Sequence, residues 1–144
     1  MEPHVSDIVR IIQLVVAPVF LLTAVGTIIA ALNVRLGRAV DRRRVLEDRL
    51  GALAPEEAGS ARDELAQIGR RIRLVYLAIL FAVLSALFVC LMIAGAFIGA
   101  LAFAELTRTI AAMFVFAMLA LIASLLLFLR EIFLAVSTPR HVPR

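Results

Sequence analysis

The side chains whose spacing suggests a shared chemical task are small, polar or basic, and they recur on one face of a helix. At about 100° per residue, one band collects Gln13, Ala17, Phe20, Ala24, Thr27, Ala31, Arg35, Arg38 and Arg42. Large aliphatic residues such as Leu22, Ile29 and Leu36 lie on the opposite face. Rings of side chains and apolar constrictions are the devices by which membrane pores select and close. The chemistry that this band offers is therefore the passage of ions.

The same band has a second interpretation, in which it packs against a neighbouring helix. Lipid does not drive helices together hydrophobically, and small residues such as Ala17, Ala24 and Ala31 allow close approach. In the pore interpretation, several copies place the band around a common axis, with Phe20 as a constriction and arginine rings at one mouth. Such rings favour anions, but bound counterions leave the selectivity open. The sequence does not decide between the two.

A further set of arginines borders the apolar runs. We expect these side chains to anchor the helices and to attract anionic lipid headgroups; they are Arg43, Arg44, Arg70, Arg71, Arg73 and Arg130. Glu131 follows the last of them and is also an interface charge. It is in addition placed to pair with an arginine beyond the first apolar run.

Residues for enzymatic chemistry are not grouped in the sequence. His4 and His141 lie in opposite tails, and Cys90, inside an apolar run, has no second cysteine for a disulfide and no companion for a metal site. There is neither a phosphate-binding glycine-rich loop nor a nucleophile elbow. We therefore predict that the protein is not an enzyme and has no catalytic residues, no metal and no cofactor. The arginines cluster beside apolar runs, so the net charge of +4 does not indicate nucleic-acid binding.

The band must be positioned by membrane-spanning helices. Hydrophobic residues make up 63% of the chain and the mean hydropathy is +1.03, and a span needs about 20 apolar residues. We predict an all-α membrane protein with transmembrane helices at 11–34, 74–104 and 109–130, an outer turn at 105–108, and an antiparallel helical hairpin at 35–73. Within the hairpin, Gly51 to Gly59 break the helix, and Pro55 before two glutamates is typical of a helix start.

The distribution of arginine predicts the orientation. Most arginines lie in 35–73, and by the positive-inside rule this hairpin and the tail at 131–144 are cytoplasmic, while the segment at 1–10 lies outside. Acids precede the first arginine, unlike in a secretory signal. We therefore expect the first run to be a retained span and the protein to reside in a bacterial inner membrane.

Three stretches together resemble a known bacterial family. They are QLVVAPVFLLTAVGTIIAALNVRLGRAVDRRRVLE at 13–47, ARDELAQIGRRIRLVYLAI before and within the second run, and LLLFLREI at 125–132. The chain is similar to the three-span membrane proteins grouped as domain of unknown function 2721. This resemblance implies a small integral membrane protein, and it implies no reaction, substrate or catalytic residue.

Two functional hypotheses follow. In the first, the protein is a homo-oligomeric ion channel whose pore is lined by the first helix, and its partners are other copies of itself, ions and a bilayer with anionic headgroups. In the second, it is a membrane scaffold or regulatory subunit that binds a partner through the hairpin. The first needs arginines turned toward a common axis, whereas the second needs an exposed apolar strip on the hairpin.

Overall fold

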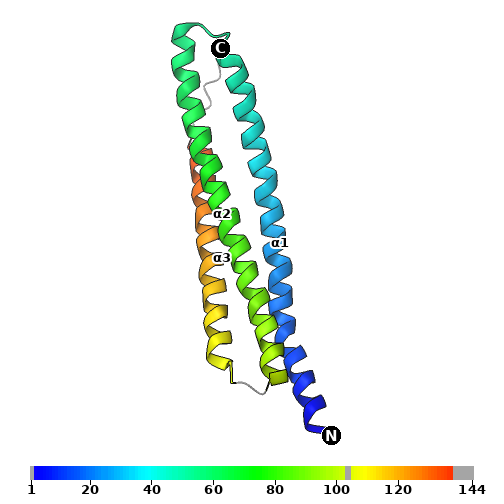
Figure 1. The fold of residues 1–144 in the computed structure, drawn as a ribbon. Coiled ribbons are helices and arrows are strands. Elements are labelled where there is room, and N and C mark those ends of the chain that lie inside the picture. The colour runs from blue at the N-terminus through cyan, green and yellow to red at the C-terminus, as the bar shows by residue number, and fades with distance from the viewer. Residues whose placement is uncertain (1, 103–104, 138–144) are drawn as a thin grey trace. The chain divides into compact units, whose positions relative to one another are not determined.

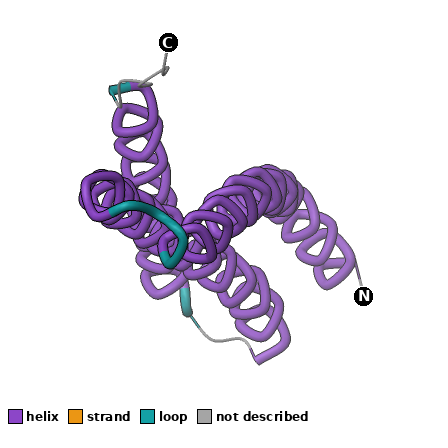
Figure 2. Tube along the Cα trace, turned by 90° about the horizontal axis from the view of Figure 1, so that it is seen from above, coloured by secondary structure: helices purple, strands orange, loops and turns teal. Residues whose placement is uncertain are grey.

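The described part of the chain consists of three long helices. The computed structural model describes residues 2–102 and 105–137, with residues 2–4 given by their backbone alone. Helix α1 spans Glu2–Leu50, α2 spans Pro55–Ala102 and α3 spans Thr107–Val136 (Figure 1). Figure 2 shows helix throughout these residues apart from the short connections. The all-α fold predicted from the sequence is confirmed.

The helix ends follow from local chemistry. α1 stops at Leu50, before Gly51, and the Ala52 N–H donates to the carbonyl of Arg49 at 3.0 Å. α2 begins at Pro55, where the missing N–H costs nothing, and Glu56 and Glu57 face the positive end of the helix dipole. The predicted break between the first two helices is therefore present, but it is only four residues long, 51–54. Helix α2 takes up the rest of the interval.

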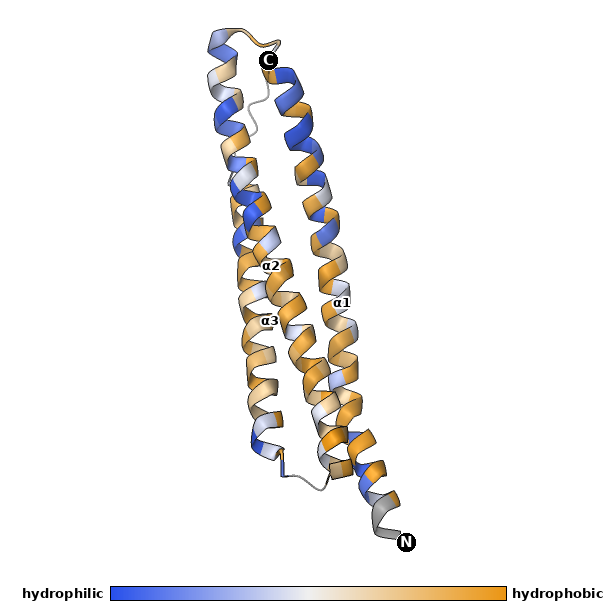
Figure 3. Cartoon of the chain, viewed as in Figure 1, coloured by the Kyte–Doolittle hydropathy of each residue, from blue (hydrophilic) through white to orange (hydrophobic). Residues whose placement is uncertain are grey.

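Each helix contains a segment apolar and long enough to cross a membrane. The three candidate spans lie in Val5–Leu50, Pro55–Ala102 and Thr107–Val136, with mean hydropathies of 2.4, 2.9 and 2.8. Figure 3 shows the hydrophilic residues of α1 and α2 gathered toward the turn that joins these helices. These features indicate a multi-pass membrane protein, as the sequence predicted.

The helices extend beyond the predicted spans. α1 already includes the predicted outer segment from Glu2 onward, α3 begins at Thr107 inside the predicted outer turn, and it continues to Val136 beyond residue 130. Backbone hydrogen bonding maintains a helix whether or not its side chains are apolar, so hydropathy marks the span and not the helix end. Residue 1, residues 103–104 of the predicted second span and residues 138–144 of the predicted tail lie outside the described part.

The chain divides into two compact units, and every helix contributes to both. The first unit comprises Met1–Ile29 and Phe81–Ala123. Its core has two clusters, one around Val25, Ala82 and Leu121 and one around Val89, Met92 and Ala117. Two of these six residues, Ala82 and Ala117, are alanines, which allow helices to approach closely in lipid. The core of this unit therefore combines small side chains with larger aliphatic ones.

The second unit comprises Ala30–Leu80 and Ser124–Arg144. Its apolar core joins α1 to α2 on either side of the 51–54 turn and centres on Leu46, Ala61 and Ile68. Leu50 and Leu53, among others, cover this cluster. Farther from the turn, the buried Ser124 hydroxyl of α3 donates to the Ala78 carbonyl of α2 at 2.7 Å. The unit thus combines an apolar hairpin core with polar contacts that bind α3 to it.

Candidate functional site

The band on α1 faces outward from the single chain. All the predicted pore-lining residues are exposed: Gln13, Ala17, Phe20, Ala24, Thr27, Ala31, Arg35, Arg38 and Arg42. The aliphatic face behind them is half-buried at Leu22, Ile29 and Leu36, and Val25 and Leu32 are fully buried. The face that packs against α2 and α3 is therefore the aliphatic one, and the band is not consumed by packing within the chain.

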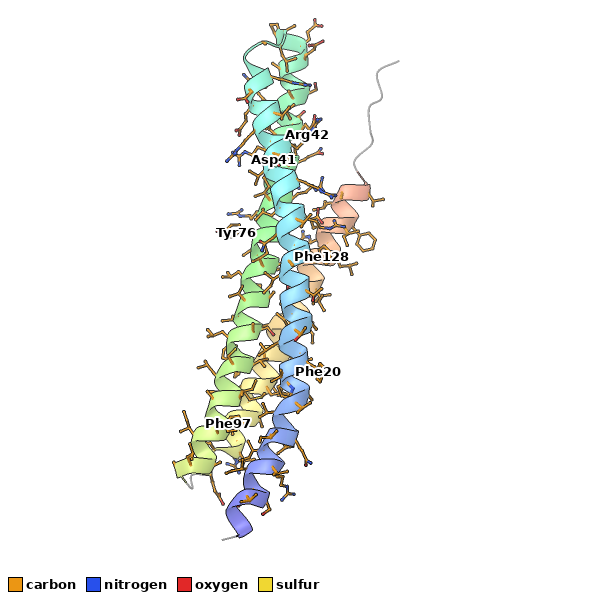
Figure 4. The ribbon with its side chains drawn as sticks, turned by 90° about the vertical axis from the view of Figure 1, so that its right-hand side faces the viewer. Phe20, Asp41, Arg42, Tyr76, Phe97 and Phe128 are labelled. Carbon is orange, nitrogen blue, oxygen red and sulfur yellow. The ribbon has the colours of Figure 1, made fainter. Side chains whose placement is uncertain are left out.

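The band keeps one phase along α1 although Pro18 lies inside the helix. Ile11 and Val15, before the proline, are half-buried like Leu22 after it, so the proline does not turn the aliphatic face away. Phe20, labelled on α1 in Figure 4, is 71% exposed and is the bulkiest apolar residue of the band. The Thr27 hydroxyl donates to the Thr23 carbonyl at 3.0 Å, which satisfies it within its own helix.

A buried carboxylate lies at the arginine end of the band. Glu131 of α3 is 2% exposed and accepts hydrogen bonds from two guanidinium groups on different helices. The Arg35 Nη1 of α1 lies 3.0 Å from Oε2. The Arg71 Nε and Nη2 of α2 lie 3.2 and 2.9 Å from Oε1. Both carboxylate oxygens are thus paired, as a buried charge requires.

The same cluster includes an aromatic ring. The Arg35 guanidinium carbon lies 5.0 Å from the centroid of Phe128, one helical turn before Glu131 on α3, which is a cation–π geometry. Figure 4 shows Phe128 beside α1. Two guanidiniums share one carboxylate, so the cluster keeps a net positive charge. Arg35 and Arg71 each have further N–H donors beyond those that bind Glu131.

The cluster marks the place where three apolar runs end. Arg35 follows directly on the uncharged residues 11–34, Arg71 lies shortly before the uncharged run that starts at Leu74, and Glu131 comes just after the run that ends at Leu129. The ion pairs therefore join the ends of all three runs. The sequence expectation that Glu131 pairs with an arginine beyond the first run is confirmed by its contact with Arg35.

The remaining arginines have different surroundings. Arg42 donates through Nε and Nη2 to Oε1 of Glu64 on α2, at 3.2 and 2.8 Å, and Arg43 pairs with Glu47 one turn along α1. The other predicted arginines are exposed and form no ion pair with a described residue: Arg38, Arg44, Arg70, Arg73 and Arg130. The structure thus brings Arg35 and Arg71 together, and leaves Arg38 as the unpaired arginine of the band.

Sequence reasoning missed part of this cluster. Arg71 was interpreted as a lipid anchor alone, and neither Phe128 nor the second partner of Glu131 was foreseen. The available signal was a single acid at the border of an apolar run, where a carboxylate needs a partner. Which arginine it takes depends on contacts far apart in the sequence. Among the described residues, no group of three or more His, Cys, Asp and Glu side chains could hold a metal ion.

Comparison of the sequence with curated proteins and with solved structures gave no match. The model of one family does match, over residues 15–141, and its description is "Protein of unknown function" (DUF2721). The matched region contains the band from Ala17 onward, the hairpin and the Arg35–Glu131–Arg71 cluster, while Gln13 precedes it. The resemblance inferred from the sequence motifs is thereby confirmed, and the chain belongs to the DUF2721 family.

Proposed function

We propose that the protein is a homo-oligomeric ion channel of the bacterial inner membrane, with a pore lined by α1. The supporting observation is the exposure of the whole band in the single chain, from Gln13 to Arg42, while the opposite aliphatic face of α1 packs internally. Three helices are too few to enclose a pathway. Cyclic assembly of several copies is the usual way to form one from small subunits.

The proposed pore has an apolar middle and a basic mouth. Phe20 is the bulkiest apolar side chain of the band and is exposed. A ring of Phe20 side chains from the assembled copies serves as the constriction, which closes the pore by dewetting. At the mouth, Arg42 pairs with Glu64 and Arg35 shares Glu131 with Arg71, so Arg38 is the arginine of the band that has no ion pair with a described residue and supplies the free positive ring. A ring of uncompensated guanidiniums concentrates anions at that end of the pathway.

In this proposal the hairpin around the 51–54 turn is cytoplasmic and the N-terminus lies outside. The arginine-rich ends of the apolar runs meet at Glu131, which supports placing the inner membrane border there. The scaffold alternative requires an exposed apolar strip on the hairpin. Residues 35–73 are all described, and among them Val45 is the one exposed large hydrophobic residue. Leu46, Ile68 and the apolar residues around them lie in the core of the hairpin instead. The channel hypothesis is therefore preferred.

The channel is tested by conductance of the purified protein in planar bilayers. Phe20→Ala removes the constriction and is expected to raise the open probability or unitary conductance, while Arg38→Ala lowers the anion preference at one mouth. Val19→Ala and Arg44→Ala are matched controls, since Val19 and Arg44 are also exposed on α1 but outside the band. Both controls are expected to behave like the unmodified protein.

Oligomeric state is measured on the same preparation by single-particle imaging in nanodiscs. A ring with α1 innermost and a conductance that responds to Phe20→Ala supports the channel. A monomer, or a dimer sealed along the band, contradicts it. The channel is equally contradicted if Phe20→Ala and Arg38→Ala leave every conductance parameter unchanged.

A further inference from the structure

An apolar groove lies in the first unit between the three helices. It has a volume of about 860 Å³ and is lined by α1 from Ile11 to Leu21, by α2 from Met92 to Ala100 and by α3 from Leu106 to Met118. Ligand sites in proteins have volumes of roughly 300–1,000 Å³ and mostly apolar walls. Of the described side chains that line this groove, Thr107 carries a hydroxyl and the others are apolar.

The dimensions of the groove match one leaflet of a bilayer. The residue steps from Ile11 to Leu21 rise by about 15 Å at about 1.5 Å each, which is half of the roughly 30 Å hydrocarbon thickness. An apolar groove of this length and volume suits the hydrocarbon chains of a lipid in one leaflet.

One end of the groove is bordered by charges of both signs. Asp7 and Arg10 precede Ile11 by one turn or less, and Glu105 and Arg108 flank the lining residues Leu106 and Thr107. All four charged side chains are exposed, and none forms an ion pair with another described residue. Two guanidiniums and two carboxylates leave this end without net charge. It complements a headgroup that carries both a phosphate and an ammonium.

From these observations we propose that the groove binds the acyl chains of one zwitterionic phospholipid. Its phosphate binds Arg10 and Arg108, and its ammonium group lies near Asp7 and Glu105. Hydrocarbon fills the space between Pro18 of α1, Ala96 of α2 and Ala111 of α3. The lipid occupies one leaflet and completes the packing of the three helices. The groove belongs to a single chain and requires no pore, although Ala17 of the band is also one of its lining residues.

The test uses phosphatidylethanolamine with a photoactivatable diazirine in the middle of one acyl chain, incorporated into nanodiscs with the full-length protein. After irradiation, adducts are mapped by mass spectrometry. They are expected to concentrate on the groove, at positions such as Ala96 and Ala111, and to be competed away by unlabelled phosphatidylethanolamine. Adducts spread evenly over the exposed apolar surface of all three helices would overturn the proposal.

Two neighbouring alanines provide a matched pair. Ala111 and Ala112 of α3 are both exposed, but only Ala111 lines the groove. Ala111→Phe fills the space and is expected to reduce the groove adducts about tenfold, whereas Ala112→Phe leaves them unchanged. Equal effects of the two substitutions contradict the site. If the groove instead gives no adducts and Ala111→Phe breaks up an oligomer, a second copy occupies the groove and the proposal is wrong.

The headgroup is tested by competition on the unmodified protein, which requires no variant to fold. Unlabelled phosphatidylethanolamine is expected to displace the probe at least as well as phosphatidylglycerol. A preference of about tenfold for the anionic lipid would refute the zwitterionic assignment. Arg10→Gln combined with Arg108→Gln is expected to weaken displacement, and Arg44→Gln, an exposed arginine outside the groove, is the control. An unchanged displacement curve in the double variant counts against the phosphate contacts.

Discussion

Among the described residues, Glu131 is the one whose ion pairs connect all three helices. Its buried carboxylate connects α3 to Arg35 of α1 and to Arg71 of α2. The two guanidiniums are partly exposed, at 42% and 34%, and can reach water when the acid is lost. The acid has no such alternative, because it is almost fully enclosed. The carboxylate is therefore the group of the cluster that is destabilised most when it loses its partners.

Glu131→Gln removes the charge that both arginines share and is expected to lower the free energy of unfolding by about 2 kcal/mol, the range for hydrogen bonds to charged groups. Arg71→Gln is expected to cost a similar amount, since it leaves the buried carboxylate with Arg35 alone. Arg130→Gln, next in sequence but exposed, is the control. Unfolding in mixed micelles measures all three, and equal stabilities of the Glu131 and Arg130 variants would show that the cluster does not stabilise the fold.

Two buried serines are expected to respond in opposite ways to the same substitution. The Ser124 hydroxyl donates to the Ala78 carbonyl, whereas the Ser85 hydroxyl is buried without a partner among the described residues. Ser124→Ala is expected to cost about 0.6 kcal/mol, a typical hydrogen bond between membrane helices. Ser85→Ala removes an unsatisfied polar group and is expected to stabilise by about 1 kcal/mol. Thermal unfolding in detergent measures both, and a change of the same sign contradicts the assignment.

At the scale of the elements, α1 and α2 form a hairpin whose core is apolar although most of its surface is charged. Leu46, Ala61 and Ile68 are buried between the two helices, and the ion pair of Arg42 with Glu64 spans them. Exposed ion pairs contribute at most about 1 kcal/mol. The stability of the hairpin therefore rests on its apolar cluster, and the ion pairs set which faces meet.

Adjacent residues of α1 test this distribution. Leu46 is 9% exposed and belongs to the core, while Val45 is 44% exposed. Leu46→Ala is expected to destabilise the hairpin by about 2–4 kcal/mol through a lost contact and a cavity, and Val45→Ala by less than about 0.5 kcal/mol. Hydrogen exchange of the amides in residues 36–72 measures the local opening. Similar protection in both variants would mean that the cluster is not the source of stability.

The α2 helix also resolves an ambiguity of its sequence. The apolar run from Leu74 is longer than one perpendicular span, which is compatible with tilt, protrusion or a turn near Gly95 and Gly99. The helix is continuous through both glycines, which eliminates the turn. A Cβ at Gly95 would meet Ile110 Cγ1 at 4.0 Å, an ordinary contact. This glycine is therefore not required by close backbone approach.

For the molecule as a whole, sequence reasoning succeeded where one physical signal dominates. Long uncharged runs predicted three helices able to span a membrane, and Pro55 with its two glutamates predicted the start of α2. The division of α1 into a band of small and polar residues and an aliphatic face was readable from periodicity, whereas the direction of the band within the chain was left open. Composition and helical phase are local properties, and they are readable from one sequence.

Features that depend on several helices at once were not predictable in the same way. Glu131 was expected to pair with one arginine and pairs with two. The second, Arg71, lies on α2, and its contact with α3 depends on how these two helices pack. The groove results from the unequal sizes of side chains such as Pro18, Ala96 and Ala111 where three helices meet. No periodicity encodes such a cavity. The helices extend beyond the predicted spans, since apolarity and helicity end at different residues.

The sharing of Glu131 has a consequence for how the family can diverge. One carboxylate binds two guanidiniums on separate helices, and both guanidiniums are partly exposed, so a lineage that loses the acid can keep both arginines at the membrane border in contact with water. A lineage that loses one arginine can still retain the acid through the other. Loss of both arginines would leave the buried carboxylate without a partner, so family members that lack arginine at both positions 35 and 71 should also lack the glutamate at position 131.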